Sequence, residues 1–160
     1  MSLFKTTFSR ALPVIKSDNA NIPYPNAIES GTNTSTAASQ LIDSTATFVT
    51  FNVKVGDIVY NTTDSTAATV VSVTNETTLV LNANIFAATA KAYTIYQASP
   101  QTGMGNPGCY LYVGGTGTLV VTTIGNDVLT FSGVPAGTVL PVQVIKLASA
   151  STATLVNALW

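Results

Sequence analysis

The sequence predicts an all-β protein: an antiparallel β-sandwich or jelly-roll-like domain that carries an inserted small β-barrel-like domain. Helical periodicity is almost absent, whereas apolar and polar residues alternate in many short segments, as in half-buried strands. Thr is abundant, and its branched side chain favours a pleated sheet surface. Gly, Asn and Asp recur between the alternating segments, where they are typical of turns.

The N-terminal part predicts an arm followed by a polar stretch. Residues 1–16 contain three basic and no acidic residues, and we expect a loose arm or a first strand. An organelle transit segment is the less favoured alternative, and the apolar runs are too short for a secretory signal. Residues 29–39 (ESGTNTSTAAS) predict a flexible stretch rich in Gly, Ser, Thr and Asn.

The next block predicts five short strands. In the segment Phe48–Tyr60, apolar residues flank a Gly56-Asp57 turn, so we expect a strand–turn–strand unit. Its inward-facing side chains are predicted to be Val53, Val55, Ile58 and Tyr60. The three further predicted strands are Ala68–Thr74, Thr77–Leu81 and Ala92–Gln97, with a short helical turn expected within Asn82–Ala90. Five strands in so short a segment favour a small barrel or sandwich.

A change of composition precedes the C-terminal strands. Residues 98–108 (ASPQTGMGNPG) hold two Pro and three Gly, which predicts a linker. The strands expected after it are Cys109–Val113, Leu119–Thr123, Val128–Phe131, Val139–Leu147 and Thr154–Leu159. Turns are predicted at Gly114-Gly115 and Asn126-Asp127, and Pro141 favours an edge position or a bulge.

Charge limits the classes of partner. The 160 residues include six Lys plus Arg and seven Asp plus Glu, for a net charge of −1. We therefore expect neither nucleic acid nor a membrane as a partner, because both are recognised through a broad basic surface. Only 8% of the residues are charged, roughly a third of the usual share. Such a surface predicts a protein that is covered by neighbours in an assembly.

The residue types argue against an enzyme. The chain has no His, which removes the commonest general base and zinc ligand. Its one cysteine, Cys109, is interpreted as a small buried hydrophobe. Val113–Thr118 (VGGTGT) lacks the Gly-Lys-[Ser/Thr] of a phosphate loop and is assigned to a turn. We predict no catalytic residue, no metal site and no cofactor.

Tyrosines leave one binding alternative open. The five that could line a carbohydrate platform are Tyr24, Tyr93, Tyr96, Tyr110 and Tyr112. At alternating strand positions, however, tyrosines more often belong to a core or an interface. A carbohydrate-binding module is therefore the less favoured hypothesis.

Three motifs span the segment from Leu111 to Trp160. Tyr112–Gly115 with Gly117 gives an aromatic-Val-Gly-Gly-x-Gly start, Thr130–Val142 (TFSGVPAGTVLPV) a centre, and Thr152–Trp160 (TATLVNALW) an end. Together they resemble the head spike base protein family of gene transfer agents and tailed phages. The resemblance is continuous over about 50 residues.

An N-terminal segment extends the resemblance. Val14–Pro25 (VIKSDNANIPYP) fits the V-x-x-S-D-x-x-x-[LI]-P-x-P arm of that family. In the family the arm runs almost directly into the aromatic-Val-Gly-Gly strand, whereas here about 80 residues intervene, which implies an insertion. The predicted organisation is an arm (1–27) belonging to a docking domain, an inserted β domain with a flexible flank (28–98), a linker (99–108) and a C-terminal docking and oligomerisation domain (109–160).

The resemblance implies a structural role. We expect a virion protein of a tailed phage at the capsid surface: a head-associated spike base, decoration or cement protein acting by homo-oligomeric assembly. Its expected partners are copies of itself and the major capsid protein or a neighbouring virion protein. A tail, neck or fibre-junction protein is the alternative. The residues predicted for the assembly interface are Tyr24, Pro25, Tyr112, Pro135, Ala136, Gly137 and Trp160.

Overall fold

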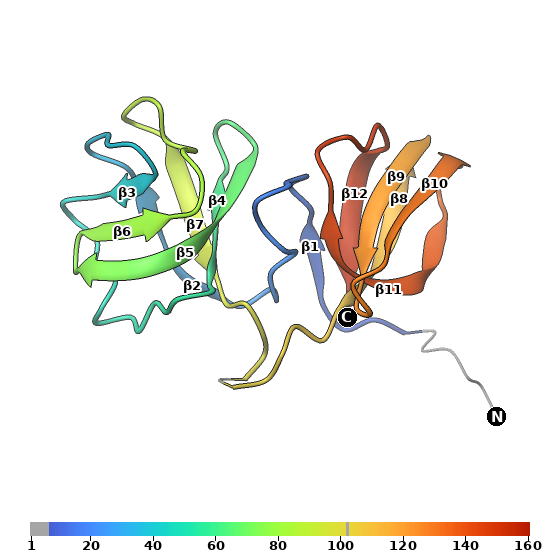
Figure 1. The fold of residues 1–160 in the computed structure, drawn as a ribbon, viewed down its shortest axis with the longest axis horizontal. Helices are drawn as coiled ribbons and strands as arrows, with labels where there is room; N and C mark the ends of the chain where they lie inside the picture. The colour runs from blue at the N-terminus through green and yellow to red at the C-terminus, as the bar shows by residue number, and fades with distance from the viewer. Residues whose placement is uncertain (1–6, 102) are drawn as a thin grey trace.

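The computed structural model describes residues 7–101 and 103–160, and these residues form twelve strands and no helix. The strands make two antiparallel six-stranded sheets that lie side by side (Figure 1). The predicted all-β fold is therefore confirmed. We call the two halves the middle unit and the C-terminal unit.

The middle unit contains six consecutive strands, in the spatial order β2-β7-β4-β5-β6-β3. They are β2 (Ala27–Thr32), β3 (Gln40–Ile42), β4 (Ile58–Asn61), β5 (Thr66–Asn75), β6 (Thr78–Leu81) and β7 (Ala92–Tyr96). Side chains at alternate positions enter a core that includes Leu41, Val59, Leu79 and Ile95. Phe48 and Phe86, from loops, close this core.

The C-terminal unit combines one N-terminal strand with the last five strands, in the order β1-β12-β8-β11-β9-β10. They are β1 (Ala11–Pro13), β8 (Cys109–Gly115), β9 (Gly117–Thr123), β10 (Val128–Val134), β11 (Val139–Leu147) and β12 (Thr154–Leu159). Leu111, Val113, Leu119, Val121 and Leu147 are fully buried in its core. The sheet curls around this core (Figure 1).

The segment between β1 and β2 holds the two units together. Ser17 Oγ donates to the Ala67 carbonyl at 3.0 Å, and Asn82 Nδ2 donates to the Asn19 carbonyl at 2.6 Å. A third apolar cluster lies at this junction, with Leu12 and Trp160 from one unit and Tyr60 and other residues from the other. Both units therefore bury apolar surface against each other as well as in their own cores.

The five predicted C-terminal strands are all present, and the alternation of apolar residues explains why. In β8, for example, Cys109, Leu111 and Val113 point into the core. Pro141 lies in β11, an interior strand between β8 and β9, so the predicted edge position is wrong. The register to β8 shifts between Leu140 and Val144, which agrees with the alternative of a bulge. Gly114 and Gly115, predicted as a turn, instead belong to β8. They occur there because a side chain at Gly114 would collide with Leu155, whose Cβ lies 2.6 Å from the added atom.

The strand predicted from Phe48 to Val55 is wrong, because this segment forms consecutive turns. Phe48 and Val53 are buried, but Val55, predicted to face inward, is 68% exposed. The carboxylate of Glu76 accepts the N–H groups of Val49 and Thr50 at 2.9 and 3.1 Å and thereby holds the turns.

Two further predictions are wrong: the helical turn within residues 82–90 and the flexible stretch over all of residues 29–39. The helical turn expected within residues 82–90 is absent, since Asn61 Nδ2 binds the Ile85 carbonyl at 2.7 Å and Asn33 Nδ2 binds the Ala88 carbonyl at 3.0 Å. These side chains take the carbonyls that a helix would use. The stretch predicted as flexible, 29–39, contains the second half of β2, which pairs with β7 through Thr32.

Candidate assembly interface

The predicted interface residues fall into two groups, and the first lies at the junction of the two units. The rings of Tyr24 and Trp160 meet edge to face, with centroids 5.8 Å apart. The Arg10 guanidinium lies 5.1 Å from the centroid of the Tyr24 ring and donates to the Pro25 carbonyl at 2.5 Å. Tyr24, Pro25 and Trp160, the three predicted interface residues of this group, are half-buried, so part of their surface is already used within the chain.

The second group is exposed at one end of the C-terminal sheet. The turn Pro135–Gly137 is joined to β8 because the Gly137 N–H donates to the Val113 carbonyl at 2.7 Å. Tyr112, 38% exposed, is the register partner of Val139 in β11. The structure therefore brings Tyr112 and this turn together, although they are far apart in sequence.

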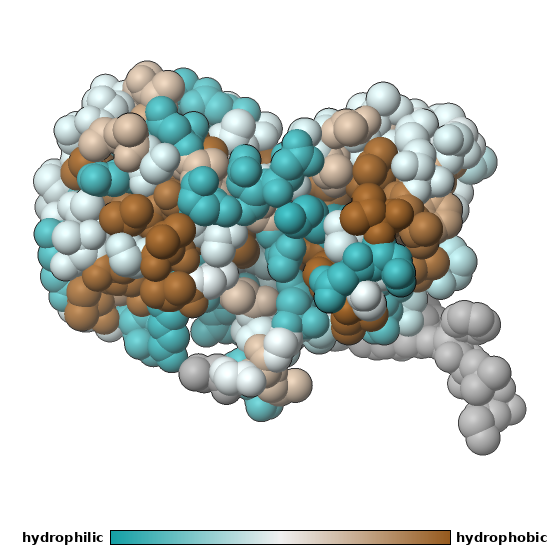
Figure 2. Space-filling view, in the orientation of Figure 1, coloured by the Kyte–Doolittle hydropathy of each residue, from teal (hydrophilic) through white to brown (hydrophobic). Residues whose placement is uncertain are grey.

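The C-terminal unit exposes further large apolar side chains that the sequence analysis missed. They are Ile124, Val128, Leu129, Val139 and Leu155. Only two charged residues, Asp127 and Lys146, occur between positions 109 and 160. Figure 2 shows hydrophobic residues gathered on the visible face of this unit. One signal was available in the sequence: Val128 and Leu129 are adjacent, so an alternating strand cannot bury both.

Leu155 is the most exposed of these side chains, at 76%. It also has a left-handed backbone, with φ of 51°, which costs energy in a residue other than glycine. Its position directly over Gly114 explains how the chain accommodates it. Burial of this protruding leucine against a partner would give its strained backbone conformation a role in assembly.

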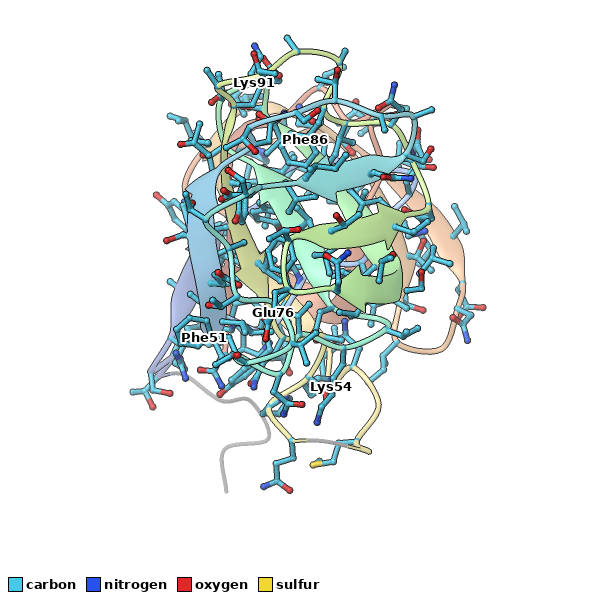
Figure 3. The ribbon with its side chains drawn as sticks, turned by 90° about the vertical axis from the view of Figure 1, so that its left-hand side faces the viewer. Phe51, Lys54, Glu76, Phe86 and Lys91 are labelled. Carbon is cyan, nitrogen blue, oxygen red and sulfur yellow. The ribbon has the colours of Figure 1, made fainter. Side chains whose placement is uncertain are left out.

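Among its described residues the middle unit also exposes Val49, Phe51, Val55 and Val71, of which Phe51 and Val55 line a small cavity. Phe51, Val55 and Met104 are among the residues that line this cavity of about 280 Å³, which lies between the turns of residues 51–57 and the linker. Figure 3 shows Phe51, Lys54 and Glu76 at one end of the unit, with Phe86 and Lys91 at the other.

One carboxylate lines this cavity, that of Asp57. Burial raises the pKa of the Asp57 carboxyl. Hydrogen bonds from the N–H groups of Lys54 and Ala98, at 2.8 and 3.2 Å, act in the opposite direction and lower the pKa. The carboxylate therefore fastens the linker to the turn before β4, which is a structural role.

The tyrosines do not gather on one exposed surface. Tyr93 is 2% exposed, packs between Phe48 and Phe86, and donates its hydroxyl to Asp43 Oδ2 at 2.8 Å. Tyr24, Tyr96 and Tyr110 are half-buried, which leaves Tyr112 as the exposed member of the five. Most of the tyrosine surface that a carbohydrate-binding platform would need is therefore buried or half-buried.

Metal-ligating and thiol side chains were looked for among the described residues. These residues contain no group of three or more His, Cys, Asp or Glu side chains that could hold a metal ion. Cys109 is buried as expected, and burial raises the pKa of its thiol to about 12, which keeps it protonated and unreactive. Within the same residues no helix has the length and apolar character needed to cross a membrane.

The candidate functional surface that we take from these observations is the exposed and weakly charged apolar surface of the C-terminal unit. The likeness of Leu111–Trp160 to the head spike base family stays a prediction from its motifs. No protein-family model, curated protein or solved structure significantly matches this chain.

Proposed function

We propose that this protein is a structural component of a tailed-phage virion: a head-associated spike base, decoration or cement protein that assembles as a homo-oligomer on the capsid. The observation that carries the proposal is the surface of the C-terminal unit. Among the described residues, eleven large apolar side chains are exposed, and six of them lie between positions 109 and 160. Large exposed apolar patches mark interaction sites, and these six side chains make the C-terminal unit the candidate here.

The charge distribution supports the C-terminal unit as the assembling half. Residues 109–160 hold two charged side chains, whereas residues 28–98 hold seven. Charged side chains are depleted in the cores of protein–protein interfaces, because burying them costs desolvation energy. The middle unit, more charged and attached through the 14–25 segment and the linker, would then project from the assembly or contact neighbouring subunits.

The junction supports a two-part arrangement. Tyr24 and Trp160 contact each other, and Ser17 and Asn19 hydrogen-bond to the middle unit. These contacts fix the direction in which the middle unit points relative to the C-terminal sheet. A fixed direction suits a protein that presents one part while another part docks.

The proposal is tested by mixing the purified chain with emptied capsids of the phage that encodes it and imaging the particles by cryo-electron microscopy. We expect the copies to form closed oligomers on the particle, seen as added density at one set of capsid symmetry axes. The double variant Val139→Thr/Leu155→Gln should lose this density. The matched double variant Val55→Thr/Val71→Thr, on the exposed surface of the middle unit, should keep it.

Two results would contradict the proposal in different ways. A monomer that leaves capsids bare would refute a capsid role. Density confined to the neck or tail would move the protein to the tail, neck or fibre junction while keeping its structural role.

A further inference from the structure

The two sheets have four edge strands, and three of them are protected against pairing with another chain. β1 lies between the two units (Figure 1), where Leu12 enters the junction cluster. β3 has three residues, and Ser35 forms a bridge to its Ile42 on the side away from β6. β2 carries Glu29, whose carboxylate accepts the Thr47 N–H at 2.8 Å. Short strands, covering segments and charges are known ways of protecting a sheet edge.

The fourth edge strand, β10, lacks these protections. Among the described residues it has a strand neighbour on one side only, β9, and it lies on the outer side of the C-terminal unit (Figure 1). Its seven residues include no charge and no proline. Val128 is 69% exposed and Leu129 is 43% exposed. The N–H and C=O groups of alternate residues point away from β9, as in any antiparallel edge strand.

A bulge sets the length of edge that can pair. The register between β10 and β9 is regular from Val128 to Phe131 and shifts before Val134. Gly133 within this interval has a φ of 62°. The regular edge therefore covers Val128–Phe131, about 14 Å of strand at about 3.4 Å per residue.

We propose that β10 is an interface strand that pairs antiparallel with β10 of a second copy of this chain, across a two-fold axis at Thr130. In this register Leu129 lies opposite Phe131, and Thr130 lies opposite itself. Leu129 and Phe131 share the core-facing side, since their register partners in β9, Val121 and Leu119, are buried. Pairing therefore extends the apolar core across the axis, and the Thr130 pair adds a favourable cross-strand contact.

A second copy is the partner that the edge fits for two reasons. The uncharged strand is complementary to itself, because its antiparallel partner brings no like charges together. A head-to-tail extension of the sheet would need β1 as the receiving edge, and β1 is enclosed between the units. Self-pairing about a two-fold axis is then the contact that remains for this sheet.

The inference rests on the homo-oligomeric part of the proposed function. A ladder that spans only Leu129–Phe131 is small beside the ~800 Å² per partner of a standard interface, so we expect a weak dimer in solution. On a capsid, other contacts would hold neighbouring copies close together, and the high effective concentration would strengthen the pairing.

Cysteine cross-linking tests the register. Thr130→Cys should give a disulfide-linked dimer under mild oxidation, because the two thiols face each other at the axis. Thr152→Cys, another exposed threonine of the same unit, should cross-link roughly tenfold more slowly, by collision alone. The wild-type chain should not cross-link, since Cys109 is buried. Equal rates for the two variants would overturn the proposal.

A charge swap tests the same contact without a covalent bond. Thr130→Lys and Thr130→Glu each place like charges together at the axis, so each variant alone should lose the dimer seen by sedimentation velocity at high concentration. A mixture of the two at low salt should recover it as a heterodimer. Unchanged melting temperatures would show that both variants fold. A Thr130→Lys variant that dimerises like the wild type would refute the β10 contact.

The capsid experiment separates this inference from the proposed function. If the wild-type chain dimerises through β10 but leaves capsids bare, the proposed function fails and the β10 contact stands. If Thr130→Lys decorates capsids as well as the wild type does, the β10 contact fails and the proposed function stands.

Discussion

Gly117 is expected to be one of the most sensitive positions in the C-terminal unit. It begins β9, and the backbone of Thr152 and Ala153 passes directly over it. A Cβ added to Gly117 would lie 2.5 Å from the Ala153 Cα and 2.8 Å from the Thr152 carbonyl carbon. Ordinary contacts to a Cβ are 3.4–4 Å, so the two backbone segments must separate by roughly 1 Å. Gly117→Ala tests whether the chain can accommodate this.

The loss of folding stability expected for Gly117→Ala has two parts. Overpacking a well-packed site by one carbon costs about 1–3 kcal/mol. Separation also stretches three hydrogen bonds at Thr118, whose carbonyl accepts the N–H groups of Thr152 and Ala153 at 2.9 and 3.2 Å and whose N–H donates to Thr152 Oγ1 at 2.9 Å. Partial loss of these bonds brings the expected total to about 3 kcal/mol. For a chain of this size that lowers the melting temperature by about 9 °C.

Urea unfolding followed by circular dichroism measures this difference. The matched control is Gly105→Ala, because an added Cβ there meets no atom within 4 Å. We expect the control to stay within about 0.5 kcal/mol of the wild type. If Gly117→Ala is as stable as the control, the close backbone approach does not explain this glycine, and the reasoning is refuted.

Three further substitutions probe buried polar groups of the middle unit. Burial, with the nearby carboxylates of Asp43 and Glu76, raises the pKa of Glu29, and its buried Oε2 has no hydrogen-bond partner among the described residues. Glu29→Gln should therefore stabilise the protein by about 0.5 kcal/mol at pH 7, allowing for solvent screening. The wild type loses stability as pH rises from the ordinary glutamate pKa through the raised one, so the advantage of the variant in thermal melts should vanish at pH 4. Asn33→Ala should cost about 2 kcal/mol in urea unfolding, since Asn33 is 1% exposed and binds the Ser35 and Ala88 carbonyls and the Lys91 N–H; a loss no larger than that of exposed Asn75→Ala would contradict this role. Burial opposes ionisation of Asp43, but hydrogen bonds from Thr45 and Tyr93 outweigh it and lower the pKa. Tyr93→Phe should cost about 1.5 kcal/mol at pH 7, and this loss should shrink as pH falls through the pKa of Asp43; a pH-independent loss would show that the hydroxyl does not act through that carboxylate.

The sequence predicts elements well where one face of a strand is buried and the other is not. Cys109, Leu111 and Val113 alternate with more exposed residues, and the strand they predict is present as β8. The same holds for β5 to β7 and β9 to β12, whose predicted bounds lie within a few residues of the observed ones. Local alternation of apolar and polar residues is sufficient to predict these strands, because pairing with neighbouring strands leaves their two-residue period unchanged.

The remaining segments depend on polar contacts between residues far apart in sequence. Glu76 holds the turns at Val49 and Thr50, 27 and 26 residues away. Asn33 and Asn61 bind loop carbonyls 55 and 24 residues away, which replaces the expected helical turn. These contacts arise only after the fold has formed, so no local pattern contains them.

The candidate surface was predicted in part. Tyr112 and Pro135–Gly137 are exposed together, whereas Tyr24 and Trp160 contact each other at the junction. Val128, Leu129 and Leu155 were missed because alternation assigns apolar residues of strands to a core. An edge strand and a left-handed residue escape that rule, since the exposure of such residues is decided by sheet order and backbone conformation.

Hydrogen–deuterium exchange on the chain alone and bound to capsids tests most directly whether the C-terminal unit is the assembly surface. We expect slower exchange on binding in β10 (Val128–Val134) and in the segment around Leu155, with little change in β5 and β6 of the middle unit. Slower exchange confined to the middle unit, with β10 and the Leu155 segment unchanged, would show that the C-terminal unit is not the assembly surface.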